Sequence, residues 1–413
     1  MNIYLSKNIE SIYFFETTTN FNTDKEEYSA NGTLAFIIYM LSKNINSLDY
    51  IAKELKSKLK INATTEEIEE KILENTIYSE KNKIYFTIDE HDKQYKLYSN
   101  FGEKFPQILH IELTGACNFH CDHCYKNANE QNKYIDYEQL ISLIYEPLIN
   151  KTQVVHLTGG EPTLHPDFEK IVKKFHNTYT LQLTTNGTNI TQYPISLYKN
   201  FQAIDISLYG LNDEEYFSNT HSHHSFNDLI NSCKKLSDSG ILFRHTVVLN
   251  EENFSKMEEY LKLSIETGAN SFGYSLPTKS GRLLQKDNKK WELSKQTRKI
   301  IYQKFRELEI KYKDKIYISP WYRSQYASGL KYKNGNERLT CSAGSTSWWV
   351  SENFMFRPCS FLPSEYINLD YDTWYKYISN EQGIDWCNAR KSLELFAVEH
   401  NVDIADLCTV FRK

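Results

Sequence analysis

Three cysteines on one short loop, Cys117, Cys121 and Cys124, are the residues of this sequence best suited to bind a metal centre. Three thiolates at this spacing can hold three irons of a cubane [4Fe–4S] cluster and leave the fourth iron without a protein ligand. That open iron would be a binding site for a substrate or cofactor. The alternative is a structural zinc site completed by His120 or His123. Zinc more often takes paired C-x2-C ligands, and this loop would have to supply every ligand alone.

A second group of cysteines occupies the last fifth of the chain: Cys341, Cys359, Cys387 and Cys408. Four thiolates can hold another Fe–S cluster. Cys233 stands alone in a helical segment, which is more typical of a buried apolar residue than of a catalyst. The histidine-rich run at residues 221–224 lies in a polar loop, and we predict a solvated connection there rather than a metal site.

Composition narrows the class of protein that carries these cysteines. Of 413 residues 40% are hydrophobic, which is enough to bury large cores. The formal net charge of −5 provides no positive field for a nucleic-acid backbone. No segment approaches the roughly 20 apolar residues of a membrane helix, and the first residues do not resemble a signal peptide. We therefore predict a cytoplasmic protein with no nucleic-acid or membrane partner, whose cysteines are thiols or metal ligands.

Six β-branched or aromatic runs predict the strands that position the cysteine loop. They are residues 108–113, 154–158, 180–185, 203–208, 243–249 and 271–275. Each is followed by a loop or a helical segment, such as residues 137–148 or 168–175. Repeated βα units predict a parallel sheet with right-handed crossovers, and six of them suit an open, partial barrel. Chemistry in such sheets occurs at the carboxyl ends of the strands.

The first hundred residues predict a small α+β module. Residues 3–5 and 11–15 have strand composition, residues 32–41 form an apolar helix candidate, and Ser47 can cap a second helix. Thr64 or Thr65 can start a third, and residues 83–88 return as a strand. This order resembles a winged helix. The third helix is acidic and would repel phosphates, which disfavours DNA binding. Residues 89–104 are polar and predict a linker.

The chain changes character after the sixth strand. A charged helical segment is predicted at residues 289–313. Residues 348–350 and 354–356 flank a turn and predict a β-hairpin between Cys341 and Cys359. The tail, residues 385–413, has mainly helical character.

The cysteine loop after the first of six βα units resembles the radical S-adenosylmethionine (radical SAM) superfamily, over residues 107 to about 280. In that superfamily the open iron chelates the amino and carboxylate groups of SAM. An electron from the cluster cleaves SAM to a 5′-deoxyadenosyl radical, which abstracts hydrogen from the substrate. The resemblance implies that Cys117, Cys121 and Cys124 are the catalytic cluster ligands. It also implies a [4Fe–4S] cluster and SAM as cofactors, and an external electron donor of the flavodoxin or ferredoxin type.

Further motifs of the superfamily follow the later strands. Gly159, Gly160 and Glu161 belong to a GGEP motif after the second strand. The resemblance implies close backbone approach at the glycines and a hydrogen bond from the SAM ammonium group to Glu161. His123 occupies the position where relatives carry an aromatic residue against adenine. The other implied SAM contacts are Thr185, Asn186, Ser207 and Asn250.

The four C-terminal cysteines resemble the ligands of a twitch domain, a shortened form of the SPASM auxiliary-cluster domain. The resemblance implies an auxiliary Fe–S cluster, most simply [4Fe–4S], on Cys341, Cys359, Cys387 and Cys408. Relatives bring their last ligands close together, whereas Cys387 and Cys408 are well separated. We predict three domains: a winged-helix-like peptide-recognition domain (1–100), a partial (β/α)6 radical SAM barrel (105–315) and a twitch-like domain (316–413).

This layout resembles enzymes that modify ribosomally made peptides, and is closest to sactisynthases. It implies a precursor peptide whose leader is added as a strand to a sheet edge of the N-terminal domain. Three reactions remain open: thioether crosslinking of a cysteine sulfur to carbon, which we favour, carbon–carbon crosslinking, and epimerisation with an enzyme thiol as hydrogen donor. Small-molecule radical chemistry and a cluster-bearing sensor are further alternatives.

Overall fold

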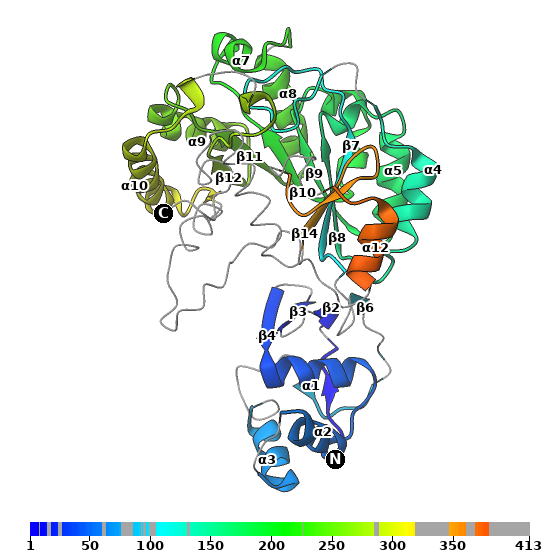
Figure 1. Ribbon diagram of the computed structural model, residues 1–413. Helices are drawn as coiled ribbons and strands as arrows, with labels where there is room; N and C mark the ends of the chain where they lie inside the picture. Colours follow the sequence, from blue (N-terminus) through cyan, green and yellow to red (C-terminus); the bar gives the residue numbers. More distant parts are fainter. Residues whose placement is uncertain are drawn as a thin grey trace. The chain divides into compact units, whose positions relative to one another are not determined.

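The computed structural model of the chain (Figure 1) describes residues 1–7, 9–14, 18–23, 27–59, 63–75, 86–91, 93, 96–98, 105–129, 133–224, 226–284, 289–318, 347–360 and 368–379. The chain divides into two units. The first consists of residues 1–107 with two short later segments, and the second contains most of the chain from residue 108 onward. Among the described residues, the larger unit contains a nine-stranded sheet, and the smaller unit contains a two-stranded and a four-stranded sheet.

Six parallel strands form the centre of the larger unit. They are β7 (Ile108–Thr114), β8 (Val154–Gly159), β9 (Thr180–Thr185), β10 (Phe201–Ser207), β11 (Phe243–Val248) and β12 (Ser271–Ser275). They lie side by side in sequence order, as the six predicted βα units require. The α/β fold with a parallel sheet is therefore confirmed.

Helices follow the strands and cover the sheet (Figure 1). They are α4 (Tyr137–Leu140), which continues as a π-helix (Ile141–Tyr145), α5 (Phe168–Phe175), α6 (Ile195–Tyr198), α7 (Asp213–Thr220), α8 (Phe226–Asp238), α9 (Met257–Glu266) and α10 (Lys295–Tyr312). Short 3-10 helices occur at Pro162–Leu164, Ile190–Gln192, Phe254–Lys256, Gly281–Leu284 and Lys289–Trp291. In α5, Phe168, Ile171, Val172 and Phe175 recur at three- and four-residue steps and are all buried, so the helix packs by one apolar side.

The two faces of the parallel sheet differ in chemistry. On one face the strands present apolar residues that are fully or almost fully buried, such as Leu157, Leu183 and Ile206. On the other, which we call the inner face, polar residues stand next to one another across the strands. Glu112 is paired with Thr158, Thr184 with Asp205, Asp205 with Arg244, and Arg244 with Ser271. Parallel sheets are usually apolar on both faces, so this row of polar side chains calls for a functional explanation.

The sheet continues beyond the six βα units at both sides. β13 (Tyr317–Ile318) pairs with β12, and β14 (Ser347–Val350) runs parallel to β7. β15 (Phe356–Arg357) pairs antiparallel with β14, which confirms the predicted hairpin. In α12 (Tyr371–Ser379), the Trp374 ring stacks on Phe356 with 4.0 Å between centroids. The sheet thus crosses the predicted domain boundary at residue 315, and the predicted division into domains stays a prediction.

In its described residues the smaller unit contains two sheets and three helices. Its strands are β1 (Tyr4–Leu5), β2 (Ile9–Phe14), β3 (Thr18–Thr23), β4 (Glu27–Asn31), β5 (Phe86–Thr87) and β6 (Lys96–Tyr98). β1 pairs with β5, and the other four form a sheet in the order β4-β3-β2-β6. The helices are α1 (Gly32–Ser42), α2 (Leu48–Leu59) and α3 (Thr65–Asn75). Buried residues such as Ile12, Ile38 and Leu55 form its core.

Predicted helix starts in this unit match the structure. The backbone N–H of Tyr50 donates to the Ser47 hydroxyl at 3.4 Å. Thr64 and Glu67 form a capping box, in which each side chain accepts from the other residue's backbone N–H, at 3.2 Å and 2.7 Å. Two expectations differ from the structure, because β3 and β4 were not predicted and β6 lies in the segment predicted as a linker. Within the described residues, no helix has the length and apolar character needed to cross a bilayer.

Candidate active site at the carboxyl ends of the strands

The cysteine loop, residues 115–129, directly follows β7. Cys117 and Cys121 are buried, Cys124 is partly buried, and all three are free thiols. Burial, followed by the nearby Glu161 carboxylate, raises the pKa of Cys117 to about 12. Burial also raises the pKa of Cys121, and the neighbouring Cys117 and Cys124 add to that shift. The three sulfurs therefore lie within electrostatic reach of one another, and they ionise readily only when a cation compensates their charge.

Backbone amides are directed at two of these sulfurs. The N–H of Phe119 lies 3.4 Å from Cys117 Sγ, and the N–H of Ala128 lies 3.4 Å from Cys124 Sγ. Hydrogen bonds to sulfur are among the features that tune Fe–S clusters. Among the described residues, no three His, Cys, Asp or Glu side chains converge as ligands of a single metal ion would. In a cubane cluster each thiolate binds a different iron, so its ligands do not need to converge on one point.

Arg282 binds the backbone of the cysteine loop, a role that the sequence analysis did not predict. Its side chain is 2% exposed, and its guanidinium donates to the backbone carbonyls of Cys121 and Ala128 and to Asn127 Oδ1. The backbone N–H of Arg282 also donates to the Cys124 carbonyl at 2.9 Å. No spacing in the sequence marks this arginine. Its partners are more than 150 residues away, so only the folded chain reveals them.

The two glycines of the GGEP motif make room for the start of the cysteine loop. A Cβ on Gly159 would lie 2.4 Å from the Thr114 carbonyl, and one on Gly160 would lie 2.1 Å from the Ala116 carbonyl. Gly159 also has a φ of 131°, which favours glycine. The N–H of Gly160 donates to Thr114 O at 2.7 Å. The close backbone approach predicted at these glycines is therefore that of the loop itself.

Glu161 is fully buried and joins the ends of β8 and β9. Its carboxylate accepts from the Thr163 hydroxyl at 2.6 Å, the Thr185 hydroxyl at 2.7 Å and the Asn186 backbone N–H at 2.7 Å. The backbone N–H of Thr163 donates as well. Burial raises the pKa of Glu161 despite these four donors, which act in the opposite direction. A hydrogen bond from SAM to Glu161 stays a prediction.

Asn118 connects the cysteine loop to the third strand end and was not predicted. The Asn186 amide donates to Asn118 Oδ1 at 2.7 Å, and the Asn118 amide donates to the Thr188 hydroxyl at 2.8 Å. Asn118 Nδ2 also lies 3.1 Å from His224 Nε2. The histidine-rich loop is therefore packed against the cysteine loop rather than fully solvated, and its His221 lies 3.1 Å from Asp122.

His123 and Ser207 meet at a small cavity of about 50 Å3. Tyr209, Trp291 and Thr246 also line it. The rings of His123 and Trp291 are 4.4 Å apart, and Tyr209 lies 5.9 Å from His123. Burial lowers the pKa of His123 to about 4, so the imidazole is neutral at physiological pH and offers an uncharged aromatic surface.

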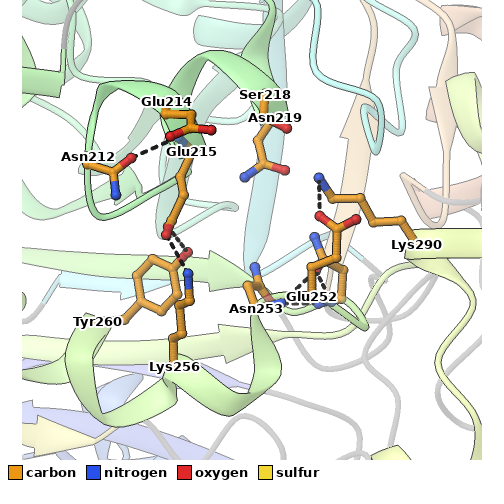
Figure 2. Close-up of a pocket in the computed structure, with 11 residues that line it drawn as sticks. Asn212, Glu214, Glu215, Ser218, Asn219, Glu252, Asn253, Lys256, Tyr260 and Lys290 are labelled. Carbon is orange, nitrogen blue, oxygen red and sulfur yellow. Dashed lines mark hydrogen bonds and ion pairs between the residues drawn. The ribbon is translucent and has the colours of Figure 1, made fainter.

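A larger cavity of about 320 Å3 (Figure 2) adjoins the small one, since Asn219 and Asn253 line both. Its rim carries two ion pairs, Lys256 with Glu215 at 2.6 Å and Lys290 with Glu252 at 3.0 Å. Among the described residues, four buried side-chain atoms that line these cavities have no hydrogen-bond partner: His123 Nδ1, Asn219 Oδ1, Asn250 Nδ2 and Trp291 Nε1. Buried polar atoms are almost always paired, so these four fit a ligand that carries both donors and acceptors.

The remaining cysteines lie elsewhere. Cys233 on α8 is fully buried, and its Sγ lies 3.2 Å from His245 Nε2. On the same strand as His245, the neighbouring Arg244 and Thr246 bond Asp205 on the inner face, so Cys233 is on the opposite face. Cys359 follows β15 and is partly buried. Three of the predicted auxiliary ligands lie outside the described residues: Cys341, Cys387 and Cys408.

Comparison with known families bears directly on this site. Residues 111–264 match the sequence profile of the Radical SAM superfamily. The chain contains a radical SAM domain. The matched part begins within β7 and includes the three cysteines, the GGEP motif and the ends of β9 to β11.

Sequence similarity to individual proteins supports the match to this domain. The chain is 26% identical over 310 residues to the antilisterial bacteriocin subtilosin biosynthesis protein AlbA of Bacillus subtilis (strain 168), covering 71% of this chain and 64% of AlbA. It is 30% identical over 168 residues to a probable GTP 3′,8-cyclase of Saccharolobus islandicus (strain Y.N.15.51), covering 39% of this chain and 54% of the cyclase. The chain thus spans less than two thirds of the length of either relative.

Solved structures share the fold. Streptococcus suis SuiB, bound to its precursor peptide SuiA, superposes with a TM-score of 0.63 at 15% identity, covering 90% of this chain and 88% of SuiB. Native anSMEcpe with bound AdoMet gives a TM-score of 0.51 at 16% identity, covering 74% of this chain and 89% of that protein. The radical SAM fold predicted from the cysteine loop is confirmed.

The residues present fit the cofactors of this superfamily, a [4Fe–4S] cluster and SAM. The three neighbouring thiols and the amides directed at two of their sulfurs suit the cluster. The unpaired atoms of Asn219 and Asn250, with the neutral ring of His123, suit a nucleoside such as the adenosyl part of SAM.

Proposed function

We propose that this chain is a radical SAM enzyme that modifies a ribosomally synthesised precursor peptide, with thioether crosslinking as the favoured reaction. The observation that carries the proposal is the buried three-thiol loop next to cavities with unpaired donors and acceptors. The similarity to AlbA and the fold shared with peptide-bound SuiB support a peptide substrate. When bound, the cluster and SAM supply hydrogen-atom abstraction.

The residues of this chain bind and orient those groups. Cys117, Cys121 and Cys124 hold the cluster. Ser207, Asn219 and Asn250 would hydrogen-bond the adenosyl group of SAM, and the ring of His123, which contacts Trp291, would hold its base. Glu161, Thr185 and Asn186 keep the strand ends and the loop in register through the hydrogen bonds described above. A fixed arrangement of this kind is what a reaction through a reactive radical needs, because side reactions must be excluded.

The inner face of the sheet suits a peptide. A cavity of about 310 Å3 on this sheet is lined by polar residues, including Asp205 and Arg244, and by apolar residues, including Ile204, Leu242 and Phe243. This volume is near the lower end of ligand pockets, roughly 300–1,000 Å3. Asp205 is paired with Arg244 and accepts from Thr246 at 2.7 Å. His110 and His156 are hydrogen-bonded to each other at 3.0 Å, and burial lowers the pKa of both. A surface with balanced charges beside apolar side chains suits a peptide, which carries backbone amides and apolar side chains.

The leader of the precursor is the second part of the proposed partner. In the four-stranded sheet of the smaller unit, β4 is an edge strand that pairs only with β3 among the described strands. An extended peptide can add to such an edge through backbone hydrogen bonds. α3 carries Glu66 and Glu67 in its first turn, which disfavours a nucleic acid as the partner of this unit.

One observation bears on the choice of reaction. Epimerisation needs a thiol that returns a hydrogen to the substrate. Cys233 cannot take this role, because it is fully buried on the face of the sheet opposite the inner face and bonded to His245. An epimerase would have to use another cysteine. Crosslinking, to sulfur or to carbon, needs no such donor, and an auxiliary cluster on the C-terminal cysteines would accept the second electron.

The test is anaerobic turnover of the iron-reconstituted chain with SAM, dithionite and the short peptide encoded beside its gene, run in D2O and read by mass spectrometry. Loss of two hydrogens per event supports crosslinking, and fragmentation then distinguishes thioether from carbon–carbon bonds. Gain of one deuterium with no other change means epimerisation. Cleavage of SAM with an unchanged peptide contradicts the proposed substrate. Replacing dithionite by flavodoxin or ferredoxin tests the proposed electron donor.

A further inference from the structure

A buried network of charged side chains connects the cysteine loop to the C-terminal hairpin. At its centre is Glu112 on β7, whose side chain is fully buried. Glu112 accepts from Lys126 Nζ at 2.7 Å, from an Arg357 guanidinium nitrogen at 2.5 Å and from the Tyr125 hydroxyl at 3.2 Å. Lys126 also pairs with Glu352 at 2.6 Å.

The members of this network come from distant parts of the chain. Tyr125 and Lys126 directly follow Cys124, whereas Glu352 lies between β14 and β15 and Arg357 ends β15. More than 220 residues separate Lys126 from Glu352 in sequence. They meet because β14 pairs with β7, which places the hairpin next to the strand that leads into the cysteine loop.

The network is electrically balanced and shielded from water. It holds two carboxylates, Glu112 and Glu352, and two cations, Lys126 and Arg357, with side chains no more than 13% exposed. Burial alone would raise the pKa of Glu112, but Lys126 and Arg357 outweigh it and hold that pKa below its usual value. Removing one member leaves an opposite charge unpaired in a poorly screened environment close to Cys124.

We propose that Glu112, Lys126, Glu352 and Arg357 together set the charge around the cluster held by the cysteine loop. The hairpin is then part of the electrostatic environment of the radical SAM cluster. Net charge near an Fe–S cluster is one of the factors that set its reduction potential. This inference rests on the loop holding a cluster, as the proposed function requires, and is independent of the peptide substrate.

The test is a redox titration of the reconstituted full-length chain, followed by electron paramagnetic resonance. The signal that changes when SAM is added identifies the cluster of the cysteine loop and separates it from any auxiliary cluster. Glu112→Gln leaves excess positive charge near the cluster. This charge stabilises the electron added on reduction, so the midpoint potential of the cluster is expected to rise. Arg357→Gln leaves excess negative charge and is expected to lower it. The double variant is expected to return close to the unchanged protein.

Three further variants separate charge from general damage. Arg357→Lys keeps the charge and is expected to leave the potential unchanged. Glu352→Gln is expected to raise the potential less than Glu112→Gln, because Glu352 pairs only with Lys126 among the described residues. This variant also serves if Glu112→Gln does not fold. Glu258→Gln removes a carboxylate that pairs with Lys311 at 2.7 Å in the same unit, and is the matched control with no expected shift.

Two results would overturn the inference. Equal potentials in all cluster-loaded variants mean that the network does not act on the cluster. Shifts in the same direction for Glu112→Gln and Arg357→Gln mean that loop displacement, not charge, is responsible. A SAM-responsive signal missing from the unchanged protein is a different outcome, because it contradicts the proposed function itself and the inference with it.

Discussion

Single residues with no motif around them hold the motif in place. Arg282 binds three acceptors on the cysteine loop, and Asn118 connects that loop to Asn186. Both are polar side chains whose partners are set by the fold. The cysteines are the proposed cluster ligands, but the conformation of the loop that carries them depends on Arg282 and Asn118.

Cys121→Ala is expected to abolish cluster binding at the loop and all SAM cleavage, because two remaining thiolates cannot hold three irons. Iron content, the visible absorption of the cluster and deoxyadenosine formation measure this. Cys233→Ser is the matched control, since it removes a buried thiol from the opposite face and keeps a donor for His245. Deoxyadenosine formation by Cys121→Ala at the level of the unchanged protein would contradict the cluster assignment.

Arg282→Met is expected to remove the guanidinium donors of the Ala128 carbonyl and of Asn127 Oδ1, and one of two donors of the Cys121 carbonyl, which also accepts from the Cys124 N–H at 3.2 Å. Each buried unsatisfied acceptor costs about 1–3 kcal/mol, so the free energy of unfolding should fall by about 3 kcal/mol, and iron loading should fall with it. Urea denaturation and iron analysis measure the two effects. Arg298→Met on α10, away from the loop, is the control. An unchanged iron content in Arg282→Met would mean that the loop keeps its shape without this arginine.

At the scale of elements, the six barrel strands were predictable and the small strands were not. β7 to β12 have dense β-branched or aromatic composition, which reflects burial of one face. β3 reads TTNFNT and β4 reads EYSAN, with little apolar alternation, so local composition does not distinguish them from loops. Their backbone pairing with β2 and with each other makes them strands.

Strand burial also predicts a pH dependence of stability. Burial lowers the pKa of His156 on β8 and of His245 on β11 to about 4, whereas an unfolded histidine has a pKa near 6.5. Between these values the unfolded chain binds more protons, so these two histidines stabilise the fold fully above about pH 6.5, and this contribution is lost as the pH falls toward 4. Each adds a slope of up to about 1.4 kcal/mol per pH unit in that window.

Urea denaturation between pH 7 and pH 4.5 measures this slope. His245→Gln is expected to reduce the slope, because one of the buried titrating groups is gone. His176→Gln, at the exposed end of α5, is the control and should leave it unchanged. A slope that is identical in His245→Gln and the unchanged protein would show that His245 does not control the acid response.

At the scale of the whole molecule, the two units suit separate proposed roles, leader binding in one and chemistry in the other. The larger unit holds the cysteine loop, the cavities and the polar inner face, while the smaller unit presents the edge strand proposed for the leader. If one unit binds the leader and the other carries out the chemistry, a bound leader keeps the rest of the same peptide available to the reacting groups. Effective concentration then favours modification of peptides that carry the leader.

Deleting residues 1–100 is expected to spare slow SAM cleavage without peptide modification and to weaken binding of the precursor peptide. Deoxyadenosine formation and fluorescence anisotropy of the labelled peptide measure the two activities separately. A peptide without its leader, tested on the intact chain, is the matched control and should bind as weakly. Equal affinity of the shortened and intact chains for the full peptide would remove the proposed role of the smaller unit.

The sequence by itself determined the three-cysteine loop, the order of six βα units and the GGEP motif, and hence the radical SAM fold. These features are local, because a spacing of cysteines or a run of β-branched residues can be recognised without knowing the tertiary contacts of those residues. Only the tertiary structure decided that Arg282 holds the loop and that Glu112 meets Arg357. It also placed Cys233 away from the inner face. Such contacts join residues far apart in sequence, and their energy exists only once the sheet has brought them together.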